Sequence, residues 1–435
     1  MDIQKSGLNL LLVAEALLLI AVLVFGLFST ATGAIKDKTK DTENSQVSEN
    51  TGAQDNWTST ESESESGTEG SNVELPFSIP EDYVEVRKTF SAAVEAKLAS
   101  MTVEQKVAQL FIVSPEALNE HRYEKVTVFG NSSKEAFDKY PVGGLVYSAL
   151  NFQNMDQTKA LLKGAKDYSQ QQYGMTLFTA IEEEGGANNS PLATTLLLDR
   201  VSSASELGNQ GLVAVQQAAG SRVNYVKGAE FNLLLSTIAD VSSALDTAYS
   251  LRTFGTDVNT VDEMVAADVK SIEAVGVGST LKYFPGKANA AANDRGVLSS
   301  NETFETLCAG SLLSYKAGID AGASFVMVGN VITSSITDDE QVPCCLSGRT
   351  VGLLRESMGF DGVLITDNFS EEGFVSVYGS ESACVEAIKA GMDMIYMPAD
   401  FVKAYNAVLE AVNNGNISAD RLNNAVGRIL TEKGV

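Results

Sequence analysis

The sequence predicts a (β/α)8 barrel that follows a transmembrane helix and a disordered linker. Short apolar runs recur through the chain after residue 80, and most precede a segment with apolar residues at i, i+3 and i+4. The block 81–435 also has the size of one such barrel, for which about 250 residues are typical and more than 400 occur with insertions. A long apolar run near the N-terminus and a polar stretch after it complete the pattern.

The N-terminal part divides into a short tail at 1–7, a membrane anchor at 8–28 and a linker at 29–80. Residues 8–28 read LNLLLVAEALLLIAVLVFGLF and carry one charge, Glu15, which is long enough for a helix to span a bilayer. A signal peptide cleaved near Ser29-Thr30-Ala31 is the alternative, but the apolar run is long for one. The linker, with stretches such as STESESESGTEGSN, is too polar to form a packed core.

The orientation of the anchor rests on two opposing signals. Lys36, Lys38 and Lys40 follow the span and only Lys5 precedes it, so a literal count of positive charges places the C-terminal side in the cytoplasm. A short N-terminus before a single span is instead typical of export. We expect the large domain to lie outside the cytoplasm.

The block 81–435 contains the barrel elements. The predicted strands, in chain order, are 109–113, 144–148, 176–181, 233–238, 279–284, 324–328, 363–366 and 394–397. Segments with helical spacing between them include 156–168, 261–274, 304–317 and 382–390. A doubly wound open sheet is the alternative, although no GxGxxG motif follows an early strand.

Composition narrows the classes of function. Lys and Arg number 31 against 56 Asp and Glu, a net charge of -25, which argues against sequence-independent binding to nucleic acid. The chain has one histidine, His121, and four cysteines without a CxxC pair, so we expect no metal site and no cofactor. The cysteines are expected to be small buried hydrophobes, with a Cys308–Cys384 disulfide as the alternative in an oxidising space.

Polar residues gather at the carboxyl ends of the predicted strands, where barrels of this kind build their sites. They are Glu182, Glu183, Glu184, Asp240, Lys282, Asn330 and Asp367. Each acid or amide, taken alone, could simply cap the following helix. Together they predict a polar mouth suited to a hydroxyl-rich or cationic ligand.

A set of collinear motifs carries a family resemblance over residues 85–435. They include MTVEQKVAQLFIV at 101–113, AIEEEGG at 180–186, RTFG at 252–255, LKYFPGK at 281–287, GFDGVLITDNFS at 359–370 and ISADRLNNAVGRIL at 417–430. The chain resembles the catalytic domains of glycoside hydrolase family 3, and most closely the single-domain β-N-acetylhexosaminidases that act on peptidoglycan. The resemblance implies a carbohydrate substrate. Together with the membrane anchor expected at 8–28, it leads us to expect the domain at a bacterial cell surface.

The resemblance also implies roles for individual residues. Asp367 matches the family nucleophile, a carboxylate that traps the sugar as a glycosyl ester in a retaining mechanism. Arg252 and Lys282 match the residues that hold sugar hydroxyls. Tyr283 replaces a sugar-contacting histidine, and Glu182 replaces a shorter acidic residue.

Other positions depart further from the family pattern. Ala187 stands where the family has an arginine, and the loop triplet Asn293-Asp294-Arg295 replaces an Asp-Ser-His triplet. The histidine of that triplet is the family's general acid/base, and an arginine does not deprotonate at physiological pH. Asp294 is the candidate substitute, unless it is a plain solvent-facing residue; the alternatives are one of Glu182–Glu184, or water acting on an activated substrate.

Two functional hypotheses follow. The first is a membrane-tethered, β-N-acetylhexosaminidase-like hydrolase of cell-wall amino sugars with Asp367 as its nucleophile. The second is a non-catalytic module that binds glycans or serves as a scaffold. Retention of Asp367, Arg252 and Lys282 favours an interaction with glycans, while the altered triplet favours loss of catalysis.

Overall fold

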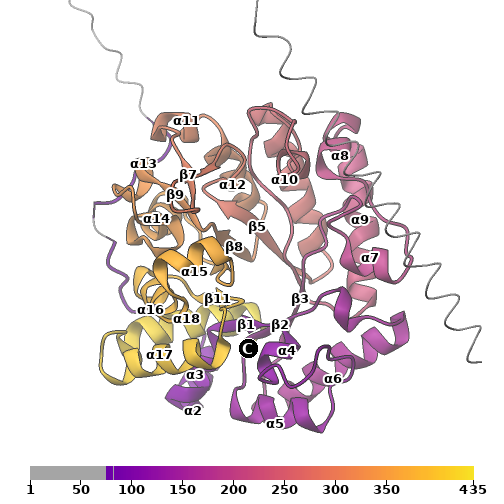
Figure 1. The fold of residues 1–435 in the computed structure, drawn as a ribbon, viewed down its shortest axis with the longest axis vertical. Coiled ribbons are helices and arrows are strands. Elements are labelled where there is room, and N and C mark those ends of the chain that lie inside the picture. Colours follow the sequence, from indigo (N-terminus) through magenta and orange to yellow (C-terminus); the bar gives the residue numbers. More distant parts are fainter. Residues whose placement is uncertain (1–74, 82) are drawn as a thin grey trace, which may run out of the picture. The chain divides into compact units, whose positions relative to one another are not determined.

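The computed structural model describes residues 75–81 and 83–435, which form a closed barrel of parallel strands surrounded by helices (Figure 1). The barrel order is β1-β11-β10-β8-β5-β4-β3-β2. Its strands are β1 Phe111–Val113, β2 Gly144–Val146, β3 Phe178–Ile181, β4 Leu233–Leu234, β5 Gly278–Phe284, β8 Phe325–Val328, β10 Val363–Asn368 and β11 Met394–Tyr396. Each overlaps one predicted strand, so the barrel prediction is confirmed.

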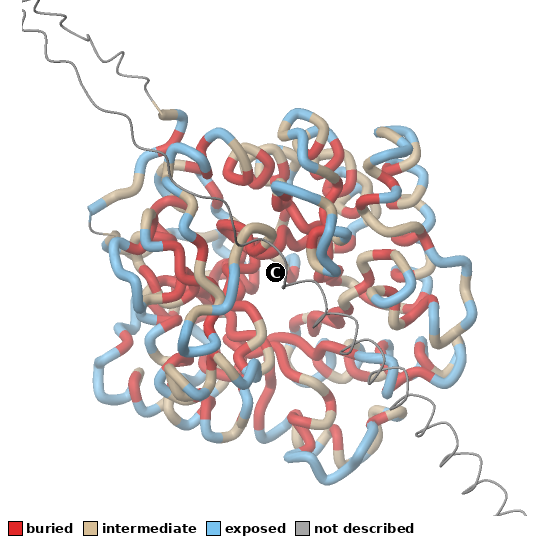
Figure 2. The backbone as a smooth tube through the Cα atoms, turned by 45° about the horizontal axis from the view of Figure 1, so that its top comes forward, coloured by how far each residue is buried: buried red, intermediate tan, exposed pale blue. Residues whose placement is uncertain are grey.

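The strands form where the sequence has apolar runs that can be buried on both faces. Every residue of β1, β2, β8 and β11 is buried. Neighbouring strands pair in parallel around the barrel, as in the pairings of Ile112 with Gly144 and of Leu145 with Thr179. The register shifts between Lys282 and Phe284 where β5 pairs with β8, and near the end of β10 where it pairs with β11. Figure 2 shows the buried backbone concentrated toward the inside of the domain.

Helices follow the strands on the outside of the barrel. Before β1 lie α2 Ala92–Ser100 and α3 Val103–Gln109, and the first three strands are followed by α4 Pro115–Leu118, α5 Asn131–Lys139, α6 Met155–Tyr173, α7 Pro191–Thr195, α8 Ala204–Gln210 and α9 Leu212–Gly228. The remaining strands are followed by α10 Val258–Glu273, α11 Phe304–Cys308, α12 Ser311–Asp320, α13 Ser334–Thr337, α14 Gly348–Gly352, α15 Glu372–Tyr378, α16 Ser380–Ala390, α17 Phe401–Asn413 and α18 Ala419–Glu432.

Side-chain caps set many of the helix starts. Thr102 and Gln105 form a capping box at the start of α3, and Asn154 and Asp257 cap α6 and α10. Such caps satisfy backbone N–H groups that have no partner within the helix. At these helices the local sequence therefore fixes where the chain leaves the preceding loop.

The prediction of one helix at 304–317 was wrong, because the segment forms two helices, α11 and α12. The break falls at Gly310, whose backbone at φ -132° and ψ -115° is not helical. Glycine is a poor helix former. The break at Gly310 separates the short helix α11 from the longer helix α12.

A small second sheet covers one side of the barrel mouth. It contains β6 Ala291–Ala292, β7 Leu298–Ser300 and β9 Val331–Thr333, in the order β6-β7-β9. The loop after β5 is therefore a β-hairpin, and β7 pairs with the segment that follows β8.

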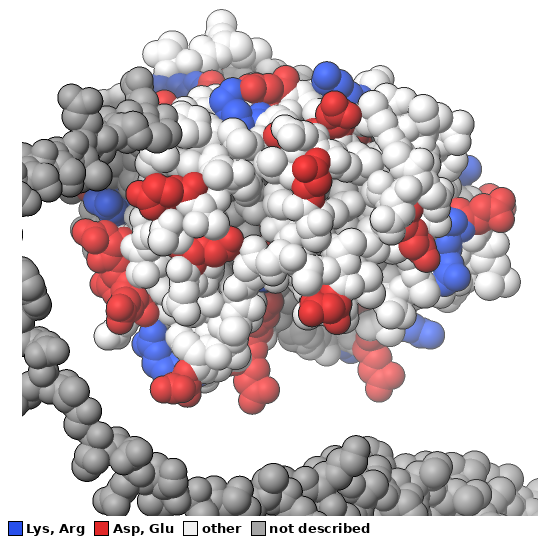
Figure 3. Space-filling model, turned by 90° about the horizontal axis from the view of Figure 1, so that it is seen from above, with Lys and Arg blue, Asp and Glu red and all other residues white. Residues whose placement is uncertain are grey.

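Other sequence predictions have mixed outcomes. All four cysteines are buried and free, so the alternative Cys308–Cys384 disulfide is not formed. The predicted membrane span at 8–28 lies outside the described residues, and no helix within 75–81 and 83–435 has the length and apolar character to cross a bilayer. Phe77, near the end of the predicted linker, is buried against the domain. Acidic side chains are spread over the face drawn in Figure 3.

Candidate active site

Residues from several strand ends meet at the mouth of the barrel and form two groups of charges. The first group, which we call the lysine-282 cluster, contains Lys282, Glu182, Glu184 and Arg252. Lys282 is fully buried, and its Nζ lies 2.8 Å from Glu184 Oε1 and 3.3 Å from Glu182 Oε2. Arg252 donates two hydrogen bonds of 2.7 Å to Glu184.

These contacts favour the ionised forms of Glu184 and Lys282. Burial by itself raises the pKa of Glu184, but Lys282 and Arg252 outweigh it and lower that pKa to about 2. Burial likewise opposes the charge of Lys282, yet Glu182 and Glu184 raise its pKa. The cluster is a fixed platform of paired charges in which Glu182, with 41% of its side chain exposed, is the accessible acid.

The second group, the nucleophile cluster, surrounds Asp367 at the end of β10. Asp367 is 3% exposed. Its Oδ1 accepts a 2.8 Å hydrogen bond from Asn368 N, and its Oδ2 accepts from Asn330 N at 3.2 Å. Lys287 Nζ forms an ion pair with the same Oδ2. The carboxylate that the family resemblance marks as nucleophile is therefore buried and held by an ammonium group.

Glu371 is the second acid of the nucleophile cluster. Its Oε1 lies 3.9 Å from Lys287 Nζ, and its Oε2 accepts a 3.2 Å hydrogen bond from Asn330 Nδ2. Cys345 donates to Asn330 Oδ1 and so fixes that amide. Burial and the negative charge of Asp367 raise the pKa of Glu371.

Tyr283 joins the two clusters. Its ring centroid lies 4.5 Å from Lys287 Nζ and 5.0 Å from Lys282 Nζ, and its hydroxyl accepts a 3.2 Å hydrogen bond from Arg252. An aromatic face attracts ammonium groups. Tyr283 therefore fills a place between the two lysines, where a histidine would add a further titratable group.

Asp240 positions the backbone that carries Lys287. It is fully buried and accepts hydrogen bonds from Lys287 N at 2.6 Å and Ala288 N at 2.9 Å. The hydroxyls of Tyr249 and Tyr315 also donate to it, each at 2.8 Å. Burial raises the pKa of Asp240, while these donors oppose the shift. Asp240 thus fixes the start of the hairpin loop.

The other predicted acids occupy different places. Glu183 is buried and accepts from Leu192 N, Ala193 N and the hydroxyl of Tyr225, so it caps α7. Glu184 is engaged by two cations. Of the three consecutive glutamates, only Glu182 faces the mouth with an exposed carboxyl group.

The loop triplet lies at the turn of the β6–β7 hairpin. Asn293 Oδ1 accepts from Arg295 N at 3.0 Å and Val297 N at 3.1 Å, so Asn293 shapes the turn. Asp294 and Arg295 are exposed. Asp294 makes no hydrogen bond or ion pair within the described part of the chain. Ala187 lies elsewhere, beside Arg252, in a cavity of about 280 Å³.

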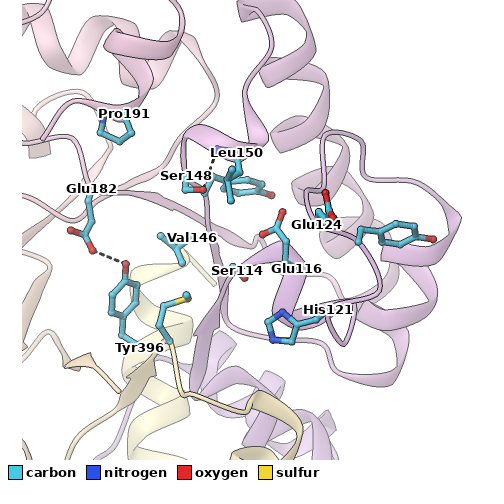
Figure 4. Close-up of a pocket in the computed structure, with 13 residues that line it drawn as sticks. Ser114, Glu116, His121, Glu124, Val146, Ser148, Leu150, Glu182, Pro191 and Tyr396 are labelled. Atoms are coloured by element: carbon cyan, nitrogen blue, oxygen red, sulfur yellow. Dashed lines mark hydrogen bonds between the residues drawn. The ribbon is translucent and has the colours of Figure 1, made fainter. Parts of the chain in front are cut away.

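A cavity of about 560 Å³ adjoins the lysine-282 cluster (Figure 4). Glu182 and Tyr396 stand at one side of it, and Tyr396 donates a 2.7 Å hydrogen bond to Glu182 Oε1. Its far side carries Glu116 and His121, from the segment after β1. Within 75–81 and 83–435, no group of three His, Cys, Asp or Glu side chains is arranged to hold a metal ion.

The structure thus brings Asp367, Lys282, Arg252, Tyr283 and Glu182 into one connected site and leaves Asp294 at its edge. Sequence reasoning missed Lys287 and Glu371. Lys287 ends the quoted LKYFPGK motif, and Glu371 follows Asp367 by four residues. The available signal was a charged residue three positions after the strand, Lys287 after β5 and Glu371 after β10.

Comparisons with known proteins identify the family and the fold. A family model, the glycosyl hydrolase family 3 N-terminal domain, matches residues 102–432. Beta-hexosaminidase A of Pseudoalteromonas piscicida is 25% identical over 69% of this chain and 54% of its own length. A beta-hexosaminidase of Methylococcus capsulatus is 26% identical over 63% of this chain and 81% of its own length.

Solved structures show the same fold. A β-N-acetylhexosaminidase from Beutenbergia cavernae has a TM-score of 0.67 and 26% identity, and the match covers 78% of this chain and all of that one. The chain spans 34% of the length of the β-N-acetylglucosaminidase/β-glucosidase of Cellulomonas fimi, to which it is 31% identical over 42% of its own residues. The chain belongs to glycosyl hydrolase family 3, through the N-terminal domain of that family.

Proposed function

We propose that this domain is a retaining glycosidase of the β-N-acetylhexosaminidase type, which removes terminal β-linked amino sugars from cell-wall glycans. The observation that carries the proposal is the buried Asp367 carboxylate at the barrel mouth, which pairs with Lys287, whose Nζ lies over the ring of Tyr283. The ion pair with Lys287 and the hydrogen bonds from Asn330 N and Asn368 N hold this carboxylate in place. The β-hexosaminidase relatives support the choice of substrate class.

In the proposed first step, an oxygen of Asp367 bonds to the anomeric carbon while the bond to the leaving oxygen breaks. The leaving oxygen takes a proton from Glu371, which becomes a carboxylate. In the second step that carboxylate removes a proton from water, the water oxygen bonds to the anomeric carbon, and Asp367 leaves as a carboxylate. Both steps balance without another reactant.

Three features support Glu371 in the acid/base role. Its carboxyl shares the Lys287 ammonium with Asp367, and its Oε1 lies 3.9 Å from Lys287 Nζ. Its side chain is 43% exposed and can meet substrate. Burial and the charge of Asp367 raise its pKa, which is the direction that a general acid requires.

The test uses the full-length protein and two β-N-acetylglucosaminides, one with nitrophenol and one with an alkyl alcohol as the leaving group. We expect Asp367→Asn to abolish both activities. Glu371→Gln should lower kcat/KM for the alkyl glycoside by about 10²–10⁴-fold, and should affect the nitrophenyl glycoside far less because nitrophenolate leaves without a proton.

Two controls separate Glu371 from its competitors. Glu372→Gln removes the neighbouring exposed carboxyl and should leave both rates unchanged, whereas Asp294→Asn removes the substitute expected from the sequence. If Asp294→Asn alone produces the leaving-group effect, the role belongs to the hairpin turn. The pH profile gives a second measure: kcat/KM should fall at alkaline pH as Glu371 loses its proton, and Glu371→Gln should remove that limb.

The second candidate function is a non-catalytic glycan-binding or scaffolding module. The triplet Asn293-Asp294-Arg295 favours it, because the family's acid/base histidine is replaced. No nitrophenol release from the wild-type protein, together with saturable binding of amino sugars that Lys282→Ala weakens, would establish this function in place of the hydrolase.

We also propose that residues 8–28 anchor the protein in the membrane with the barrel outside the cytoplasm. The apolar run and the polar linker of the sequence support this. The protein should remain in the membrane pellet after alkaline carbonate extraction, and protease added to intact cells should degrade the barrel. A mature soluble protein that begins near Ala31 would instead show a cleaved signal peptide.

A further inference from the structure

Asn330, in the turn between β8 and β9, contacts both carboxyl groups of the nucleophile cluster. Its side chain and backbone are buried, with 2% of the residue exposed. Its backbone N–H donates to Asp367 Oδ2 at 3.2 Å, and its side-chain Nδ2 donates to Glu371 Oε2 at 3.2 Å. One residue therefore holds the proposed nucleophile through its main chain and the proposed acid/base through its side chain.

The orientation of the Asn330 amide is set by two neighbours of opposite kind. The backbone carbonyl oxygen of Asn368 can only accept a hydrogen bond, and it faces Asn330 Nδ2 at 2.8 Å. The fully buried thiol of Cys345 donates to Asn330 Oδ1 at 3.4 Å. A rotated amide would turn its oxygen toward the Asn368 carbonyl and lose both contacts. With one hydrogen of Nδ2 on Asn368, the other is directed at Glu371.

This donor makes the two oxygens of Glu371 unequal. Oε2 accepts from Asn330, whereas Oε1 accepts no hydrogen bond from the described part of the chain. Lys287 Nζ lies 3.9 Å from Oε1, which is beyond hydrogen-bond distance. In a protonated carboxyl group one oxygen carries the hydrogen and the carbonyl oxygen is the better acceptor. The carbonyl oxygen of Glu371 is therefore Oε2, and its proton is on Oε1.

The groups around Glu371 act on its charge in opposite directions. Burial and the negative charge of Asp367 raise its pKa, while Lys287 and the hydrogen bond from Asn330 lower it. A residue that first donates a proton and then accepts one must be stable in both forms. The Asn330 amide stabilises the carboxylate that remains once the proton has left.

We propose that Asn330 is the positioning residue that divides the work between the two carboxyl groups. Its side chain reserves Oε2 of Glu371 as an acceptor, so that Oε1 presents the proton to the leaving group, and Cys345 keeps the amide in this orientation. In the first step this proton moves to the leaving oxygen, as that oxygen's bond to the anomeric carbon breaks and Asp367 bonds to the carbon. This inference rests on the proposed function, because Glu371 is the acid/base only in the proposed hydrolase.

The kinetic test compares the full-length wild-type protein with Asn330→Ala. This change removes the amide and leaves the backbone N–H that donates to Asp367. We expect kcat for the alkyl β-N-acetylglucosaminide to fall by about 10–100-fold, the cost of a misplaced catalytic group, with little change in KM. The nitrophenyl glycoside should lose much less, because nitrophenolate leaves without a proton. Equal losses with both glycosides would overturn the proposal.

The pH profile gives a readout that a purely structural role would not move. Asn330 lowers the pKa of Glu371 by donating to its carboxylate, so removal of the amide should raise that pKa. The alkaline limb of kcat/KM for the alkyl glycoside should therefore move to higher pH in Asn330→Ala. A limb that stays in place would show that the amide does not act on Glu371.

Cys345 provides the conservative rescue. Cys345→Ala removes the donor to Asn330 Oδ1 and should reproduce the Asn330→Ala pattern in a weaker form, whereas Cys345→Ser restores a donor and should recover most of the lost rate. Cys384→Ala, at a buried free cysteine on α16, is the control and should alter neither kcat nor the alkaline limb. Identical rates for the two Cys345 variants would overturn the part assigned to Cys345. This pair also keeps the test decisive if Asn330→Ala does not fold.

Asn424 on α18 is the matched control for the loss of buried hydrogen bonds. It is fully buried, accepts from Lys88 N at 2.8 Å and donates to Val86 O at 2.8 Å. Asn424→Ala should lower thermal stability and leave kcat and the alkaline limb unchanged. A similar shift of the limb in Asn424→Ala would assign the effect of Asn330→Ala to general loosening of the fold.

Infrared difference spectroscopy tests the contact without turnover. The carbonyl stretch of protonated Glu371 is identified by its absence in Glu371→Gln. A hydrogen bond to a carbonyl oxygen lowers its stretching frequency, so Asn330→Ala should move this band to higher frequency when Oε2 is the carbonyl oxygen. An unmoved band would place the proton on Oε2 and overturn the inference.

The infrared and kinetic results separate this inference from the proposed function. Nitrophenol release together with an unmoved band would keep the hydrolase and overturn the role of Asn330. A shifted band in a protein that releases no nitrophenol would support the contact of Asn330 with Glu371 and overturn the hydrolase.

Discussion

At the scale of single residues, the ion pair between Lys287 and Asp367 is the buried contact that holds the nucleophile cluster together. The two side chains are 7% and 4% exposed, so each charge depends on the other for its stabilisation. Removing one partner of a buried pair leaves the other charge uncompensated. Lys287 is thus a requirement of the fold as well as a neighbour of the nucleophile.

We expect Lys287→Met to lower the free energy of unfolding by about 3–5 kcal/mol, as measured by denaturant titration. Lys287→Arg keeps the charge and should lose less. A matched control is Lys316→Met, whose partner Asp320 is 61% exposed, and which should cost about 0–1 kcal/mol. A Lys287→Met protein as stable as the wild type would show that Asp367 needs no cation.

At the scale of elements, the β6–β7 hairpin and α15 form one unit. A Cβ placed on Gly373, in α15, would lie 2.5 Å from the carbonyl oxygen of Gly296 at the hairpin turn. Only glycine allows this approach. The turn that carries Asp294 and Arg295 therefore packs against α15, the helix that follows β10 and its Asp367.

Gly373→Ala should separate the hairpin from α15 and lower the free energy of unfolding by about 1–3 kcal/mol, the usual range for overpacking. Hydrogen exchange should show faster exchange in 291–300. Gly228→Ala, at a helical position with no atom near the added Cβ, is the control and should be neutral or slightly stabilising. Unchanged exchange in the hairpin of Gly373→Ala would mean that the two elements are independent.

The positions of the barrel strands and helices could be predicted from the sequence, whereas most contacts between these elements could not. The barrel strands are apolar runs with helical segments between them, a pattern that can be recognised locally. The break at Gly310 had a local signal that the helical spacing masked. The hairpin also had one, the turn residues at 293–296, but its strands are only two and three residues long.

The site shows the same division between local and distant information. Asp367, Lys282 and Arg252 were predicted because motifs mark them. The pairing of Lys287 with Asp367 joins residues 80 positions apart, and no periodicity carries such a contact. The same holds for Glu182 and Tyr396, which are 214 positions apart.

At the scale of the whole molecule, the barrel is closed at the end opposite the site by a buried lysine. Lys433 is 8% exposed, and its Nζ donates a 2.7 Å hydrogen bond to Gln109 Oε1 and lies 5.1 Å from the ring centroid of Phe178. Burial lowers the pKa of Lys433 to about 7. The C-terminal end of the chain thereby links the stability of the whole domain to pH.

Whether stability rises or falls with pH follows from the pKa of Lys433 in the folded protein and in the unfolded chain. Between pH 7 and the ordinary lysine pKa of about 10.5, the unfolded chain holds a proton on Lys433 that the folded protein lacks, so stability rises with pH, by at most about 1.4 kcal/mol per unit. Lys433→Met should therefore be more stable than wild type at pH 7, with a difference that shrinks toward pH 10. Lys159→Met, on the surface, should show no such trend in thermal unfolding.

The packing of Gly373 against Gly296 has a consequence for any attempt to rebuild the family's chemistry in this chain. Writing Asp-Ser-His into positions 293–295 restores the residues, but the new imidazole would stand on a turn that is held against α15. Reconstruction of the ancestral proton transfer therefore has to free the turn as well as change its side chains, so residue swaps alone are an incomplete design.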